Sequence, residues 1–217
     1  MSKVIIAASH IAQGSASSAW GRSRHFMLLK EITLVIGASM LMAVCAHVSL
    51  PLVFSPVPIT LQTFGVLLIG LTLGGHRGFA ALALYLAEGA AGLPVFSPAG
   101  LGGMAQLAGV TGGFLMAYPA AAYVAGALFE QKRVRTLFKG AFAAAVCAAL
   151  IAEIVIFASG LTWLKLFTGV SFGKAIMMAI APFIPGEVLK IAAVAAIAAR
   201  FSRFTALAPT ISQPTLK

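Results

Sequence analysis

The sequence has little charge. Only 9% of its 217 residues are Asp, Glu, Lys or Arg, and only five of these are acids. A soluble domain carries about 25% charged residues, whereas this chain is 60% apolar with a mean hydropathy of +1.01. It cannot cover itself with a water-compatible surface, which excludes a water-soluble enzyme or a nucleic-acid-binding module. Long apolar runs separate most of the charges, a pattern typical of a protein that crosses a lipid bilayer several times.

Residues for metal, disulfide or hydrolytic chemistry are equally scarce. The chain has two cysteines, Cys45 and Cys147, and both lie in apolar runs. Its four histidines are scattered, so there is no disulfide framework and no metal-ligand spacing. No two acids occur at helical spacing, as a paired-carboxylate hydrolytic centre would require. We therefore expect no enzyme activity, no metal and no cofactor.

Six apolar runs approach the length of about 20 residues that a helix needs to cross a bilayer. They predict an all-α integral membrane protein with six transmembrane helices. The second run is short and carries Gly65, Gly70 and Gly74, which favour close packing against neighbouring helices. The six runs cover residues 32–53, 59–74, 77–96, 104–128, 140–160 and 180–200.

The basic residues predict the orientation of these helices. With the N-terminus inside, twelve of the 15 Lys and Arg residues fall on the inner side. Lys165 and Lys174 fall outside, and Lys190 falls within a span. Because cytoplasmic loops carry an excess of Lys and Arg, both termini are predicted to be cytoplasmic. The expected domains are a cytoplasmic polar tail at 1–31, a six-helix membrane domain at 32–203 and a cytoplasmic C-terminal tail at 204–217.

Two predicted outer segments have an unusual composition. One has three prolines within residues 51–58, followed by Thr60 and Gln62; the other, at 92–103, reads GLPVFSPAGLGG. Irregular backbone beside a membrane is tolerated only where protein or a water-filled cavity satisfies it. Both segments are therefore expected to fold over a site that opens to the outer face.

Glu187 and Lys190 are two charged residues inside the sixth predicted helix. Lys190 lies ten residues before Arg200, so it is about 15 Å from the predicted inner boundary. Their i, i+3 spacing places both on one helix face, and ionisable groups at that depth usually face a cavity or a partner. The pair predicts a binding site for a small polar group. The alternative is a mutual ion pair that only fixes helix packing.

Glu88 and Glu153 also fall within predicted spans, the third and the fifth. Three interpretations stay open for each: it lines the same cavity, it carries a proton, or it stays protonated against a neighbour.

Four motifs, taken in order, resemble the BioY family, the biotin-specific S components of energy-coupling factor transporters. They are SPVPITLQTFGVLL, YLAEGAAGLPVFSPAGLGG, GVTGGFLMAYPAAA and PFIPGEVLK, within a resemblance that covers residues 32–200. The resemblance implies a prokaryotic cell-membrane protein that captures biotin at the outer face. A transmembrane coupling protein and two cytoplasmic ATPases would then drive its release to the cytoplasm.

The resemblance also implies roles for particular residues. The acid and the lysine of the family's PGDxxK pattern fall on Glu187 and Lys190, which are implicated in holding the ureido ring of biotin. The usual Asp is Glu in this chain, one methylene longer. The polar turn of the family falls on Thr60 and Gln62.

The rest of the expected site comes from the third predicted helix and the outer loop after it. Tyr85 and Phe96 are expected to enclose the ring, and the Gly-rich loop falls on Gly102 and Gly103, among other glycines. Some relatives have a polar residue in this loop, where this chain has Leu101. Backbone N–H groups of the loop are therefore expected to bind the biotin carboxylate.

A second function stays open from the residues alone. Glu88, Glu153, Glu187 and Lys190 would serve equally as a proton relay in a small proton-coupled secondary transporter that acts alone. That protein would take up its substrate along a pH gradient and would need no ATPase partners.

Overall fold

A computed structural model describes residues 26–52 and 55–207. Most of the predicted N-terminal tail, residues 1–25, and the end of the predicted C-terminal tail, residues 208–217, lie outside the described residues. The described chain is mostly helical and starts with a helix at Phe26–His47. The remaining helices are α2 (Gln62–Leu73), α3 (Gly75–Ala90), α4 (Gly103–Ala108), α5 (Gly112–Glu130), α6 (Lys132–Leu137), α7 (Ala141–Thr168), α8 (Phe172–Ala179) and α9 (Ile184–Leu207).

A short β-hairpin follows the first helix and corrects the predicted end of that helix. Strand β1 (Ser49–Leu52) pairs antiparallel with β2 (Ser55–Thr60), so the helix predicted to reach residue 53 ends at His47. The prolines of this segment explain the difference, because proline lacks the N–H that a helix needs and keeps the preceding residue extended. The Ser55 hydroxyl donates to the Met178 carbonyl at 2.7 Å, which ties β2 to α8.

Helix lengths differ from the six runs read from the sequence. Three described helices, Phe26–His47, α5 and α7, are long and apolar enough to cross a membrane alone. The pair α8 and α9, bent by 53° at the break between them, makes a fourth if the two count as one span. Helix α2 has 12 residues, about 18 Å of helix against a hydrocarbon core of roughly 30 Å. The chain is thus a multi-pass membrane protein built from helices of unequal length.

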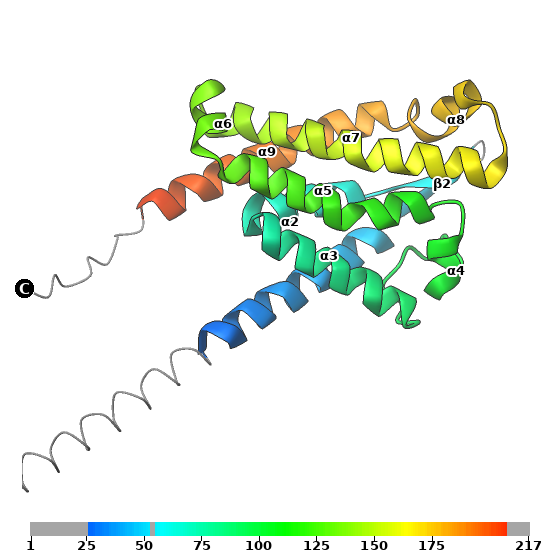
Figure 1. The fold of residues 1–217 in the computed structure, drawn as a ribbon, viewed down its shortest axis with the longest axis horizontal. Helices are drawn as coiled ribbons and strands as arrows, with labels where there is room; N and C mark the ends of the chain where they lie inside the picture. The colour runs from blue at the N-terminus through cyan, green and yellow to red at the C-terminus, as the bar shows by residue number, and fades with distance from the viewer. Residues whose placement is uncertain (1–25, 53–54, 208–217) are drawn as a thin grey trace, which may run out of the picture.

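Helix α5 lies at the centre of the bundle, between α7 on one side and α2 and α3 on the other (Figure 1). The hairpin strand β2, α4 and α8 lie toward one end of the bundle. Helix α6, the start of the first helix and the end of α9 lie toward the opposite end. The two ends of the described chain therefore share one side of the bundle.

Glycines let α5 approach the turn between α2 and α3. A Cβ atom at Gly70 would lie 2.5 Å from the carbonyl oxygen of Ala122 in α5, and one at Gly126 would collide with the backbone of Gly75. Such contacts are shorter than van der Waals packing permits. The predicted close packing of the second run therefore occurs within the chain itself.

This packing predicts opposite effects for one substitution at two helical glycines. Gly126→Ala should destabilise the protein by about 1–3 kcal/mol, because the new methyl group overpacks the contact between α5 and the α2–α3 turn. Gly37→Ala is the matched control, since its Cβ would meet nothing within 4 Å, and it should leave stability unchanged or raise it. Thermal unfolding in detergent measures both variants. Equal melting temperatures would contradict the close contact at Gly126.

Candidate functional site

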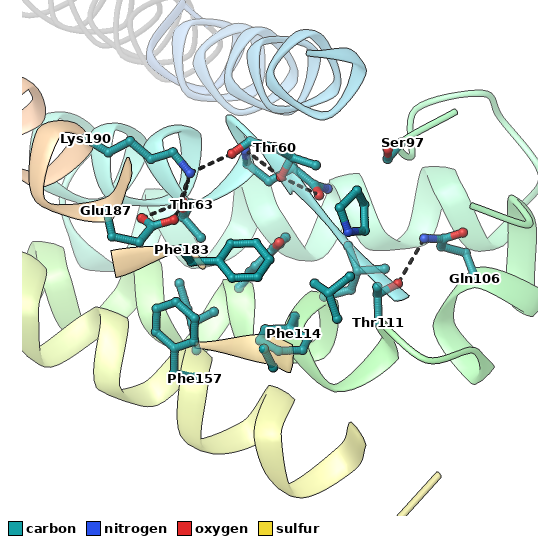
Figure 2. A pocket seen from close by; sticks show the side chains of 17 residues that line it. Thr60, Thr63, Ser97, Gln106, Thr111, Phe114, Phe157, Phe183, Glu187 and Lys190 are labelled. Carbon is teal, nitrogen blue, oxygen red and sulfur yellow. Dashed lines mark hydrogen bonds and ion pairs between the residues drawn. The ribbon is translucent and has the colours of Figure 1, made fainter. Parts of the chain in front are cut away.

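A cavity lies inside the bundle between β2, α2, α5, α7 and α9, with α4 at its far end (Figure 2). Phe114, Phe157 and Phe183 wall its middle. The space open to the centre of a water molecule is about 40 Å³. Polar groups gather at two ends: a charged end formed by Thr60, Thr63, Glu187 and Lys190, and a neutral end formed by Ser97, Gln106 and Thr111.

Glu187 and Lys190, the two charged residues of the charged end, lie in the first two turns of α9. This helix begins at Ile184 after the break that follows α8, and Pro185 is tolerated because it lies in the first turn. The Lys190 ammonium lies 2.8 Å from the Glu187 carboxylate, and the two side chains are only 10% and 8% exposed. The i, i+3 spacing read from the sequence thus brings the pair into direct contact at the cavity.

Every N–H of the Lys190 ammonium has an acceptor. It donates to the Thr60 carbonyl at 2.6 Å, to the Thr63 hydroxyl at 2.9 Å and to Glu187 at 2.8 Å. The Thr63 hydroxyl in turn donates to the Glu187 carboxylate, at 2.9 Å to one oxygen and 3.0 Å to the other. An ammonium has three donors, so the charged end is internally satisfied as it stands.

Thr60 and Gln62, both expected at the site, do line the cavity. Thr60 ends β2, and its hydroxyl accepts from the backbone N–H of Gln62 at 3.2 Å as α2 begins. The Gln62 amide donates to the Tyr85 hydroxyl at 2.9 Å. The turn between β2 and α2 therefore presents a carbonyl to Lys190 and an amide to the cavity.

Tyr85 and Phe96 lie behind the wall and are not among the residues that line the cavity. Their rings meet edge to face with centroids 5.3 Å apart. Both residues are buried, and the Phe96 ring packs over Gly89 near the end of α3. The aromatic walls come from Phe114, Phe157 and Phe183 instead, and Tyr85 supports the site through Gln62.

Gly102 caps the start of α4 and Gly103 begins the helix. Their φ angles of +69° and +58° are a backbone conformation that favours glycine. They do not line the cavity either, and the Gly102 N–H already donates to the Gln106 amide oxygen at 3.3 Å. A second cavity, with about 150 Å³ open to the centre of a water molecule, lies beside this loop. It shares Pro58, Gln106 and Thr111 with the first, and Gly100 and Leu101 are among its other lining residues.

Thr63, Gln106 and Thr111 are polar lining residues that the sequence interpretation did not select. Gln106 is buried, and its amide donates to the Thr111 hydroxyl at 3.0 Å. Polar residues are rare within apolar runs, so the sequence could have indicated these three as candidate site residues. The three phenylalanines carried no such signal, since one apolar residue among many does not reveal which way it faces.

The two acids left open by the sequence have different surroundings. Glu88 accepts a hydrogen bond of 2.5 Å from Ser39 of the first helix, and it does not line the cavity. Glu153 is buried on α7, and neither of its carboxylate oxygens has a hydrogen-bond partner among the described residues. No three His, Cys, Asp or Glu side chains gather into a metal site in residues 26–52 and 55–207.

Comparisons with known proteins identify the family. A family model described as "BioY family" matches residues 15–206. The chain belongs to the BioY family. It is 37% identical over 174 residues to the "Probable biotin transporter BioY" of Pyrococcus horikoshii, covering 80% of this chain and 97% of that relative. It is also 40% identical over 154 residues to the "Biotin transporter BioY" of Rhizobium etli, covering 68% of this chain and 78% of that relative.

A solved structure shares the fold of this BioY protein. The "S-component for biotin from an ECF-type ABC transporter" superposes with a TM-score of 0.72 over 82% of this chain and 93% of that one, at 24% sequence identity. The family predicted from the four motifs is thereby confirmed. In this BioY protein the motifs meet around one cavity, where they contribute Thr60, Ser97, Thr111 and Glu187 in turn.

Proposed function

We propose that this protein takes up biotin, binding it in the cavity between β2, α2, α5, α7 and α9. The observation that carries the proposal is the buried Glu187–Lys190 pair at the end of an aromatic cavity, in a chain whose relatives are named biotin transporters. A mostly apolar cavity with a few placed polar groups is the usual form of a small-molecule site.

Biotin matches the chemistry of the charged end. Its ureido ring offers two N–H donors and one carbonyl acceptor, and its thioether ring is apolar. Glu187 would accept from a ureido N–H group, and Lys190 would donate to the ureido oxygen. Hydrogen bonds to charged groups contribute about 1.5–3 kcal/mol each. The three phenylalanines would pack against the thioether ring.

Binding would require the hydrogen bonds of the charged end to rearrange. The three donors of Lys190 are all in use without ligand. The ureido oxygen would replace one present acceptor of Lys190. We expect it to replace the Thr63 hydroxyl, because this hydroxyl would keep its hydrogen bond to Glu187. Any widening of the cavity on this side would separate β2 and α8, which meet at the Ser55–Met178 hydrogen bond.

The second cavity is the proposed position of the biotin carboxylate. It adjoins the neutral end through Gln106 and Thr111, and Gly100 of the Gly-rich loop also lines it. A valerate tail that leaves the charged end passes the aromatic walls and reaches these groups. Amide and hydroxyl donors, together with backbone N–H groups of the loop, would bind the carboxylate.

We further propose six spans in the cell membrane with both termini in the cytoplasm. Short helices α2 and α3 would complete the six, and the basic helix α6 lies at the same end of the bundle as both ends of the described chain (Figure 1). The sequence carries no nucleotide-binding motif, so ATP use would come from partners: a transmembrane coupling protein and two cytoplasmic ATPases. The solved structure that shares this fold is described as the S-component for biotin from an ECF-type ABC transporter, which supports a role with such partners here.

Lys190→Ala should abolish biotin binding while the protein stays folded. The lost hydrogen bond and the unpaired Glu187 together should weaken binding at least about 100-fold. Isothermal titration of purified protein in detergent measures affinity, and gel filtration reports folding. Lys174→Ala is the matched control, because Lys174 is exposed on α8. Wild-type affinity in Lys190→Ala, or no saturable binding of biotin by the wild type relative to lipoate, would contradict the proposal.

Gln106→Leu should weaken binding of biotin about tenfold, as expected for one hydrogen bond to a charged group. It should change the binding of biotin methyl ester by less than about threefold, because the ester has no carboxylate charge. Gln131→Leu, an exposed glutamine after α5, is the control. Equal losses for both ligands would show that Gln106 supports the loop and does not contact the tail.

The proton-coupled secondary transporter receives no support from the arrangement of acids. Glu88 hydrogen-bonds Ser39 and lies outside the cavity lining, so the four charged residues do not form one chain. Cells that express this protein with an energy-coupling module should accumulate labelled biotin more than cells that express it alone, and a protonophore should not abolish initial binding. Uptake by the protein alone that follows the imposed pH gradient would favour the secondary transporter.

A further inference from the structure

Helix α7 carries one acid, Glu153, at a buried position beside the charged end. The residue is 5% exposed, and neither carboxylate oxygen has a hydrogen-bond donor in the part of the chain that the structure describes. A buried carboxylate that stays charged without a donor or a cation is strongly unfavourable. Buried acids are therefore paired with a donor or cation, or they are protonated and neutral. One of these two states must hold for Glu153.

The ionisable groups that face Glu153 are Glu187 and Lys190 of α9 and Tyr118 of α5. Glu187 interacts with Glu153 more strongly than Lys190 does. Ile156 and Phe157, one turn further along α7, line the same cavity as Glu187, so Glu153 lies beside the charged end. All three N–H groups of Lys190 are already bonded to Thr60, Thr63 and Glu187. The cluster thus holds two acids and one ammonium whose donors are all in use.

Two carboxylates cannot bond to each other, because neither has a proton to donate. This explains why Glu153 lacks a hydrogen-bond partner among the described residues although it interacts with Glu187. One proton on the pair removes the conflict, since a carboxylic acid is a donor and a carboxylate is a strong acceptor. Glu187 already accepts from Lys190 and Thr63, so it is the member that stays charged.

We propose that Glu153 is a positioning residue, a carboxylic acid whose O–H donates to the Glu187 carboxylate. The cluster of Glu153, Glu187 and Lys190 then has no net charge. A carboxylate has about four acceptor sites; Lys190, Thr63 and Glu153 occupy three and leave one for a ligand N–H. The proton stays on Glu153 and no covalent bond changes. Its consequence for biotin rests on the proposed function, but the hydrogen bond itself does not require a ligand.

Infrared spectroscopy tests the proton without biotin. The C=O stretch of a protonated carboxyl is separate from the carboxylate bands, and Glu153→Gln should remove one such band from the wild-type spectrum. Glu130→Gln, at the exposed end of α5, should leave that band in place. Persistence of the band in Glu153→Gln together with its loss in Glu187→Gln would place the proton on Glu187 and overturn the proposal.

Ligand binding tests the positioning role. Glu153→Leu removes the donor and should weaken biotin binding at least about tenfold, whereas Glu153→Gln keeps an N–H donor and should recover affinity to within about threefold of wild type. Wild-type affinity in Glu153→Leu, or no recovery in Glu153→Gln, would contradict the role. If the wild type itself binds no biotin, the proposed function fails, and the infrared result still decides the state of Glu153.

Discussion

The burial of one ammonium group constrains the whole site. The Lys190 side chain is only 10% exposed, so each unsatisfied N–H would be costly. Its three acceptors come from three separate elements. Thr60 supplies a carbonyl at the end of β2, Thr63 a hydroxyl in the first turn of α2, and Glu187 a carboxylate in the first turn of α9. The hairpin, the start of α2 and the break before α9 must therefore keep their positions together.

The two ends of the cavity differ in charge. The charged end is internally satisfied without ligand, and the neutral end is built from the Gln106–Thr111 hydrogen bond, with phenylalanines between them. A ligand with a polar head, an apolar middle and a polar tail matches this order. The internal satisfaction of Lys190 also means that a ligand must offer equivalent hydrogen bonds, which discriminates against molecules that merely fit by shape.

The sequence predicts the charged end well for a physical reason. Charge inside an apolar run is rare, so Glu187 and Lys190 stand out, and helical spacing alone places them on one face. Thr60 and Gln62 follow a proline-rich segment that cannot continue a helix, which predicts a turn beside the membrane.

The parts that sequence reasoning missed depend on contacts between distant segments. Tyr85 and Phe96 are aromatic and near the outer loop, so the sequence suggested that they line the site. In the structure they pack against each other outside the cavity lining, and Phe157 of α7 is one of the aromatic residues that line it. A hydropathy window also assigns β1 to the first helix, and it cannot show that α2 ends after 12 residues. Both errors arise because apolar composition does not reveal where the backbone hydrogen bonds of a helix stop. Thr63 was visible in the sequence, but its place between Lys190 and Glu187 follows only from the packing of α2 on α9.

The central claim is that biotin binds at the polar cluster around Lys190 by replacing one of its present hydrogen bonds. An experimental structure of the purified protein with biotin bound tests it most directly. The account predicts the ureido ring within hydrogen-bonding distance of both Lys190 and Glu187, with the thioether ring among Phe114, Phe157 and Phe183. Biotin bound elsewhere, with the Lys190–Glu187–Thr63 contacts unchanged from the ligand-free arrangement, would contradict it.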